Sequence, residues 1–229
     1  MPTQALQTTV ELDQARDRYR SRVIPPERLK IMDEATSALV RSGLRSTAVK
    51  EGDRVDDFIL MDAHGRPVQL QQLLETGPVV VTFYRGGWCP YCNIELRGLQ
   101  RALPEIKELG ASLIAISPQL PDNSLSTEEK NSLTFPVLSD VGNVIARRFG
   151  IAFRLPDELL KTYEDFNHGL EKKNGKEGAL ELPMPATFVL DKGGTTILSF
   201  VDEDYTKRLD PEVILATLRK LGSVSVAEV

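Results

Sequence analysis

A buried strand leads directly into a helix in the middle of this 229-residue chain, and both cysteines lie at the junction. The run PVVVTFY at residues 78–84 is rich in β-branched residues and indicates a strand covered on both faces. Residues 93–110 then place Leu96, Leu99 and Leu103 at helical spacing. A buried strand followed by a packed helix is typical of α/β proteins.

The rest of the chain supplies further elements of the same two kinds. Two strands around a turn, a second buried strand, a hairpin and a closing helix are predicted, in that order, at residues 57–70, 112–118, 186–202 and 211–221. We therefore expect an α/β protein whose central mixed β-sheet is flanked by helices.

The chain is expected to divide into an extension and one domain. Residues 1–47 predict a helical N-terminal extension, in which Pro26 suits the first position of a helix and Gly43 suits its end. Residues 48–229 form the domain, with an insertion at 152–182 that is polar and helical in character. Insertions of this length in compact domains are usually functional or mobile, so we expect a lid or an oligomer contact.

Charge and hydropathy exclude several classes of function. The net charge of −5 argues against a nucleic-acid-binding protein, which would carry a basic surface. The longest apolar run, at residues 78–84, is far shorter than the roughly 20 residues that cross a bilayer. The first 20 residues contain no apolar segment of a secretory signal, so we predict a cytoplasmic location. Paired cysteines in a reducing compartment are more often metal ligands or catalytic thiols than structural disulfides.

Cys89 lies where the strand ends and the helix begins, and Pro90 suits the first helical position. The free N–H groups and partial positive charge of a helix N-terminus favour a thiolate, so we expect the pKa of Cys89 to be lowered. Cys92 follows one helical turn later, within reach to close a disulfide. Such a pair can attack an oxidised partner and then release the product as the second thiol closes the ring.

Two other interpretations of the cysteine pair remain open. Buried free cysteines can simply pack as small hydrophobic residues. A structural zinc site needs four ligands, and the chain offers two cysteines and two histidines. His64 and His168 lack ligand spacing, and we interpret both as exposed loop residues. No metal and no cofactor are therefore expected.

Three segments carry a resemblance to a known family: WCPYC at 88–92, FPVLSDVGNVIARRFGI at 135–151 and PMPATFVLDKGG at 183–194. In this order they resemble the peroxiredoxin-like (AhpC/TSA) family of the thioredoxin superfamily, with a CPYC motif of the thioredoxin and glutaredoxin type. The resemblance covers about residues 50–222 and implies a thioredoxin-like fold. It also implies that Pro185 is a cis-proline that faces the two cysteines.

The two related families assign the attacking cysteine differently. A resemblance to the peroxiredoxin pattern places the attacking thiol at Cys92 and the family's glutamate at Glu95. It then puts Cys89 at the family's threonine, Arg85 at its proline and Asn143 at its arginine. The thioredoxin resemblance instead makes Cys89 the attacking residue, which the free N–H groups of the helix also favour.

The buried acidic residue of thioredoxins has no counterpart on the strand before the cysteines of this chain. Thioredoxins carry a buried acid there, and the comparable position in this chain is Thr82. Another group or a water molecule would then have to accept the proton of the second thiol.

The resemblance implies a thiol-dependent antioxidant oxidoreductase. The leading prediction is a peroxidase that reduces hydrogen peroxide or organic hydroperoxides through a Cys89–Cys92 disulfide, with thioredoxin or a glutathione-type system as reductant. The alternatives are a dithiol–disulfide oxidoreductase and an interaction protein controlled by oxidation of the cysteines. Expected substrate-binding residues are Arg85, Trp88, Tyr91 and Pro185, and a homodimer is the candidate assembly.

Overall fold

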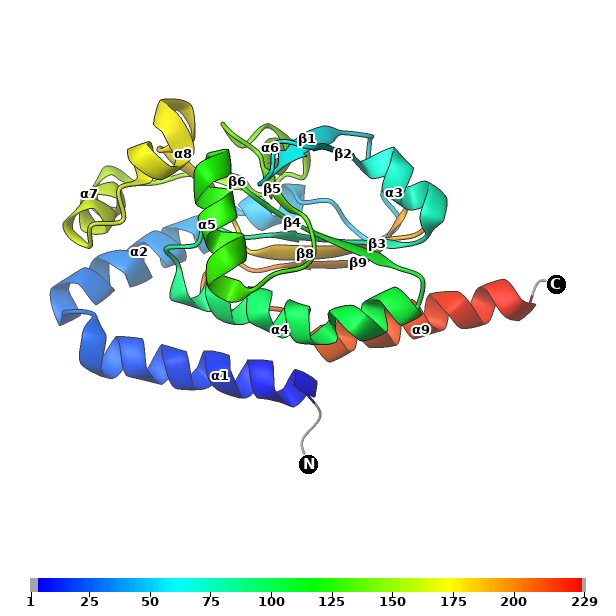
Figure 1. Cartoon of the computed structure of the whole chain (residues 1–229). Coiled ribbons are helices and arrows are strands. Elements are labelled where there is room, and N and C mark those ends of the chain that lie inside the picture. The colour runs from blue at the N-terminus through cyan, green and yellow to red at the C-terminus, as the bar shows by residue number, and fades with distance from the viewer. Residues whose placement is uncertain (1–3, 228–229) are drawn as a thin grey trace.

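The computed structural model describes residues 4–227. A seven-stranded sheet with the order β2-β1-β5-β4-β3-β8-β9 lies at its centre (Figure 1). The strands are β1 Ile59–Asp62, β2 Pro67–Gln69, β3 Val79–Phe83, β4 Ser112–Ser117, β5 Val137–Ser139, β8 Ala186–Leu190 and β9 Thr196–Val201. Strands β3, β4 and β5 are parallel, whereas β8 pairs antiparallel with β3 and β9. The sheet is mixed, as the sequence predicts.

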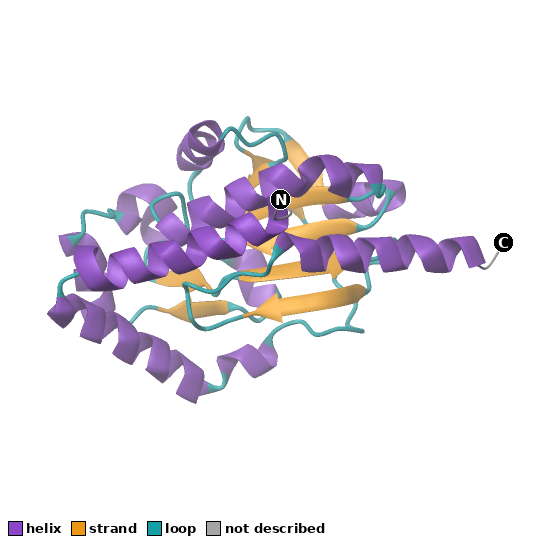
Figure 2. Ribbon diagram, turned by 90° about the horizontal axis from the view of Figure 1, so that it is seen from below, coloured by secondary structure: helices purple, strands orange, loops and turns teal. Residues whose placement is uncertain are grey.

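Helices cover both faces of this sheet. They are α3 Leu70–Thr76, α4 Pro90–Glu108, α5 Pro121–Asn131, α6 Val144–Arg148 and α9 Pro211–Ala227. Side chains alternate along β3, so Val79, Val81 and Phe83 pack with α3 and α6 on one face. Val80 packs with α4 and α9 on the other face. Figure 2 shows long helices crossing in front of the strands on this second face.

The N-terminal extension folds as predicted into helices, but it contains a π-helix that the sequence did not indicate. Its elements are α1 Gln4–Arg18, the π-helix η1 Tyr19–Val23, α2 Pro26–Ser42 and the 3₁₀ helix η2 Leu44–Thr47. Gly43 ends α2 in the left-handed region, with φ 69°. Helix α1 packs along α4 and α2 packs against the insertion, so the extension lies on the domain (Figure 1).

The insertion forms a small unit of its own beside the main sheet. It consists of β6 Ala152–Arg154, α7 Asp157–Asp165, α8 Leu170–Gly178 and β7 Glu181–Pro183. Strands β6 and β7 pair antiparallel and bring the two ends of the insertion together. Leu155, Leu159, Tyr163 and Leu182 form a separate apolar cluster, which Met32 of α2 joins. The insertion and the extension therefore support each other.

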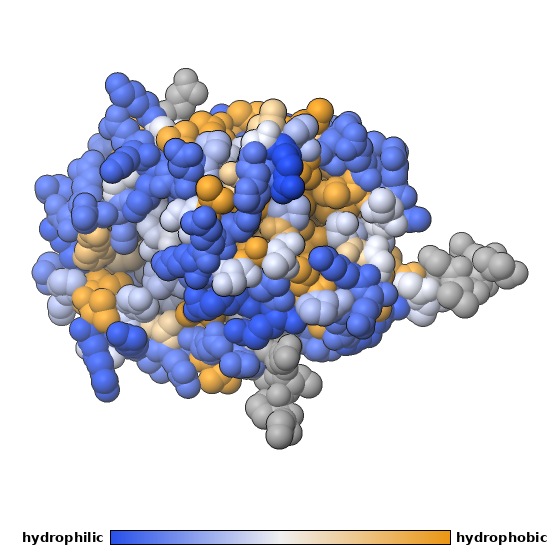
Figure 3. Space-filling model, in the orientation of Figure 1, coloured by the Kyte–Doolittle hydropathy of each residue, from blue (hydrophilic) through white to orange (hydrophobic). Residues whose placement is uncertain are grey.

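Polar side chains cover most of the face seen in Figure 3, and a group of hydrophobic side chains is visible over the α1–α2 connection. Among the residues that the structure describes, no helix combines the length and the hydropathy needed to cross a membrane.

Helix α1 packs closely on α4 at Gly98, and this contact can be tested by mutation. A Cβ atom at Gly98 would lie 2.4 Å from Oγ1 and 2.7 Å from Cγ2 of Thr8. We expect Gly98→Ala to displace α1 and to lower the free energy of unfolding by about 1–3 kcal/mol, the usual effect of overpacking. Denaturant unfolding measures this change, and hydrogen exchange of the α1 amides measures the displacement.

Gly222→Ala is the matched control, because Gly222 also lies within a helix and no atom lies within 4 Å of its added Cβ. There, the replacement should be neutral or stabilising, since alanine favours a helix over glycine by about 0.5–1 kcal/mol. Equal stability of the two variants would contradict close packing of α1 on α4.

Candidate active site

The loop between β3 and α4 positions the first cysteine. Cys89 has an extended backbone and is the N-cap of α4, and Pro90 takes the first helical position. The Cys89 N–H donates to the carbonyl of Gly86 across 3.0 Å. Gly86 has φ 145°, and a Cβ there would lie 2.4 Å from Nε1 of Trp88. Glycine at this position therefore lets the Trp88 ring lie against the loop.

Buried amide side chains fix the loop from the side of α5. Asn93 of α4 donates from Nδ2 to the carbonyls of Gly87 and Cys89, each across 2.9 Å. Asn131 of α5 donates to Oδ1 of Asn93, and Gln119 accepts the N–H of Gly87, both across 2.8 Å. The carbonyls and amides next to the first cysteine are thus held in place by groups that are themselves packed.

The second cysteine lies beside a buried ion pair that was not expected from the sequence. Nε of Arg208 donates to Oε2 of Glu95 across 2.5 Å, and its Nη2 donates to Sγ of Cys92 across 3.2 Å. Nη1 donates to the carbonyls of Tyr205 and Lys207. The Arg208 side chain is 0% exposed. It comes from the loop before α9, where no local motif distinguishes it from a surface arginine.

A second buried arginine lies on the other side of the cysteines. Arg85 lies two residues after the end of β3, and its Nη2 donates to the hydroxyl of Tyr163 from the insertion. Its guanidinium lies 5.0 Å from the ring centre of Trp88, 5.3 Å from that of Tyr163 and 4.7 Å from that of Tyr205. Its Nε is buried and has no hydrogen-bond partner within the described part of the chain. Aromatic faces are favourable neighbours for such a cation.

These charges separate the pKa values of the two thiols. Burial alone would raise the pKa of Cys89, but the hydrogen bond from Cys92 and the charges of Arg85 and Arg208 outweigh it and lower this pKa to about 5. Burial, the hydrogen bond to Cys89 and the charge of that thiolate raise the pKa of Cys92 well above its ordinary value. At neutral pH, Cys89 is the thiolate and Cys92 the thiol.

Glu95 supplies the buried acid that is absent from the strand before the cysteines. Burial raises the pKa of Glu95 to about 7, although the charge of Arg208 opposes the shift. Thr82, at the position of the acid in thioredoxins, has its Oγ1 3.5 Å from Oε1 of Glu95. The Glu95 carboxyl group therefore reaches from α4 to the place that the buried acid occupies in thioredoxins.

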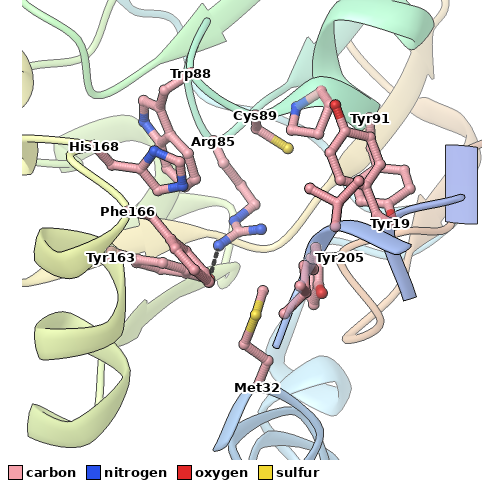
Figure 4. Close-up of a pocket in the computed structure, with 13 residues that line it drawn as sticks. Tyr19, Met32, Arg85, Trp88, Cys89, Tyr91, Tyr163, Phe166, His168 and Tyr205 are labelled. Atoms are coloured by element: carbon pink, nitrogen blue, oxygen red, sulfur yellow. Dashed lines mark hydrogen bonds between the residues drawn. The ribbon is translucent and has the colours of Figure 1, made fainter. Parts of the chain in front are cut away.

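Three of the expected substrate-binding residues, Arg85, Trp88 and Tyr91, line one cavity with Cys89, whereas Cys92 does not line it. Figure 4 shows the Cys89 sulfur pointing into the space between Arg85 and Tyr91. Pro90 of α4 also lines the cavity, and the remaining lining residues come from the extension, the insertion and the loop before α9. None of these was predicted as a site residue: Tyr19, Val23, Ile24, Met32, Tyr163, Phe166, His168 and Tyr205.

The expectation that Pro185 is a cis-proline is wrong. The described residues contain no cis peptide bond, so the bond before Pro185 is trans. Pro185 borders a second, smaller cavity with Arg85 and Tyr163 instead of the cavity that contains Cys89. The N–H of Met184 donates to the carbonyl of Ile151, so the chain enters β8 from the base of the insertion, and the proline continues this extended path.

Two further expectations are corrected. Asn143 is not at the cysteines: it is the N-cap of α6 and donates to the carbonyl of Glu181 across 3.0 Å. His168 is half-buried and stacks on Trp88, with ring centres 4.7 Å apart. His64 is exposed, as expected, and pairs with Glu128.

Within the described chain, no three His, Cys, Asp or Glu side chains form a group that could hold a metal ion.

Comparison with known families decides the assignment. Residues 52–198 match the model of the AhpC/TSA family, which is more than half of the chain. The chain belongs to the AhpC/TSA family. This confirms the expected family and thioredoxin-like fold. The matched range includes the cysteines, the insertion and the hairpin up to the middle of β9, and it excludes the extension and Arg208.

The chain is similar to several peroxiredoxins. It is 29% identical over 192 residues to a chloroplastic peroxiredoxin Q of Sedum lineare, covering 83% of this chain and 88% of that protein. The crystal structure of peroxidoxin BcpB from Mycobacterium tuberculosis matches with a TM-score of 0.60 and 28% identity, covering 76% of this chain and 98% of that one. A structure of peroxiredoxin 6 from Arenicola marina matches in fold, with a TM-score of 0.61 and 17% identity over 76% of this chain and 74% of its own.

The order of the two thiol pKa values can be measured by alkylation. We expect iodoacetamide to modify Cys89 first, at a rate that rises as the pH increases through about 5 and then levels off, because the thiolate is lost below the lowered pKa. Peptide mapping identifies the modified residue. In Cys89→Ser, the remaining Cys92 should react slowly at neutral pH. Earlier modification of Cys92 would contradict this order.

Proposed function

We propose that this chain is a thiol-dependent peroxidase in which Cys89 attacks the hydroperoxide. The thiolate attacks the terminal oxygen, an S–O bond forms, and the O–O bond breaks so that its electron pair leaves with the second oxygen. That oxygen takes a proton and departs as water or alcohol, while Cys89 becomes a sulfenic acid. Cys92 then attacks this sulfur, and the hydroxyl leaves as water with the proton of Cys92.

The observation that carries this proposal is a thiolate in a cavity with a guanidinium beside it. Cys89 is 1% exposed and lines the cavity, and Arg85 lines it as well. Breaking the O–O bond develops negative charge on the departing oxygen. Donors fixed in a site that excludes water stabilise such charge strongly. The unpartnered Nε of Arg85 is a donor of this kind.

The surroundings of Cys92 support its role as the second thiol. It must lose a proton as it closes the disulfide, and its raised pKa makes this loss unfavourable without help. Arg208 donates to Cys92 and also holds Glu95. With a pKa of about 7, Glu95 is poised to accept a proton at neutral pH. We therefore propose Glu95 as the general base for disulfide formation.

Burial of the cysteines favours a small substrate over a protein disulfide. Cys89 and Cys92 are 1% and 0% exposed, so a protein partner could reach neither sulfur without displacing part of the surrounding wall. A hydroperoxide can enter the cavity as it stands. The resulting disulfide needs a two-electron reductant, for which we propose a glutathione-type thiol, which is small enough to enter the cavity, or thioredoxin, which reaches the disulfide only when part of the surrounding wall is displaced. The cytoplasmic location and the homodimer remain predictions.

Replacement of Arg85 tests the peroxidase step. Arg85→Ala should slow the reaction of the reduced protein with peroxide by about 10²-fold, the order of magnitude for loss of one oxyanion donor. Stopped-flow fluorescence of Trp88, the only tryptophan, follows this reaction. Exchange with a small disulfide should fall much less, because it depends on Arg85 only through the lowered pKa of the Cys89 thiol. Arg41→Ala, at an exposed position of α2, is the control and should react like the unmodified protein. An unchanged peroxide rate in Arg85→Ala would refute this role.

Replacement of Glu95 tests the second step separately. The rate of disulfide formation from the sulfenic acid should rise as the pH increases through about 7, because Glu95 accepts a proton only when ionised. In Glu95→Gln this inflection should disappear, while the first reaction with peroxide continues. Rapid mixing followed by acid quenching and mass spectrometry measures both species. Retention of the inflection in the variant would exclude Glu95 as the base.

A further inference from the structure

The cavity over Cys89 is much larger than hydrogen peroxide requires. Its volume is about 250 Å³. A water molecule takes up about 30 Å³ in the liquid, so hydrogen peroxide, with two oxygens, needs about twice that volume. The space therefore exceeds the small peroxide several-fold, and room remains for a substantial organic group next to the reacting oxygens.

The walls of this cavity are apolar and largely aromatic. Trp88 and Tyr163 pack with ring centres 5.3 Å apart, and Tyr91 packs against Tyr19 at 5.9 Å and Tyr205 at 5.8 Å. Such walls bind an apolar body by removing its surface from water, and aromatic rings also favour an aromatic ligand. Figure 4 shows these rings surrounding the space into which the Cys89 sulfur points.

The charges around the cavity favour a neutral ligand. Arg85 is the cation at its Cys89 end, and the Cys89 thiolate balances that charge. Burial lowers the pKa of His168 to about 4, so its ring is neutral near pH 7. Among the residues that the structure describes, no carboxylate lines the cavity. A carboxylate or phosphate on the ligand would find no free positive charge there, whereas a neutral hydroperoxide can accept the N–H of Arg85.

One side of the cavity is built by the extension, which lies outside the matched family range of residues 52–198. Tyr19 and Val23 are the ends of the π-helix η1, Ile24 follows it, and Met32 lies on α2. Short π-helical turns within helices occur frequently at functional sites. Here the widened turn lies where the extension meets the cavity.

We propose that Tyr19, Val23, Ile24 and Met32 make the N-terminal extension a substrate-binding element, which selects neutral organic hydroperoxides with a bulky apolar body over hydrogen peroxide. This inference rests on the proposed peroxidase function and names its substrate class. The aromatic walls favour arylalkyl hydroperoxides in particular. The reaction is the one given above, with the alcohol as the product that leaves the cavity.

Binding can be tested without any turnover. Cumyl alcohol, the unreactive product of cumene hydroperoxide, should bind the reduced protein saturably and change the fluorescence of Trp88, which lines the cavity. Val23→Phe, which adds four carbon atoms, should weaken this binding by at least about tenfold, since a single methylene already changes binding in an apolar pocket by about this factor. Val23→Leu, which adds a single methylene, should have a smaller effect.

Val40→Phe is the matched control. Val23 and Val40 both belong to the extension and are 49% and 54% exposed, but only Val23 lines the cavity. The same substitution at Val40 should leave alcohol binding unchanged. The second measurement is the ratio of the rate constants for cumene hydroperoxide and hydrogen peroxide, which should fall in Val23→Phe and stay constant in Val40→Phe.

The outcomes separate the two proposals. Saturable binding that weakens only at position 23, with a lowered rate ratio, supports the substrate assignment. Fast reaction with both peroxides but equal ratios in the two phenylalanine variants overturns the role of the extension and leaves the peroxidase function intact. Binding of the alcohol without fast reaction of either peroxide overturns the peroxidase function and, with it, the substrate assignment. Absence of binding also overturns the inference.

Discussion

The burial of two arginine side chains beside the cysteines governs the rest of the site. A guanidinium removed from water costs several kcal/mol unless opposite charge and hydrogen-bond acceptors replace its hydration. Arg208 has Glu95 and two backbone carbonyls. Arg85 has the Tyr163 hydroxyl and aromatic faces, and no carboxylate forms an ion pair with it in the described chain. The Cys89 thiolate is therefore the anion that balances Arg85.

This balance changes during the proposed reaction. The thiolate disappears when Cys89 becomes a sulfenic acid or a disulfide, and Arg85 then keeps only its neutral partners. Its contacts with the rings of Trp88, Tyr163 and Tyr205 do not depend on the state of the sulfur. Cation–π contacts are worth about 2 kcal/mol or more when desolvated. The aromatic walls thus serve the cation as well as the apolar cavity.

Much of the fold was predictable because it rests on local patterns. Runs of β-branched and other apolar residues predicted the strands, and apolar residues at helical spacing predicted α4. Pro26 and Gly43 marked the ends of α2. The π-helix η1 was not predictable, because no single residue type specifies the extra residue in its turn. The trans bond before Pro185 was missed because the family resemblance was extended to a position where the insertion changes the path of the chain.

The sequence by itself determined the α/β order of elements and the placement of Cys89 at a helix N-terminus, because both depend on neighbours within a few residues. Only the tertiary structure decided the surroundings of the thiols. Arg208 reaches Cys92 across 116 positions of sequence, and Arg85 meets Tyr163 across 78. Such contacts arise from how the sheet, the extension and the insertion pack, and no local pattern records them. The sequence thus placed Cys89, the proposed nucleophile, at the start of a helix, and the packing set its charge and enclosed it in an apolar cavity.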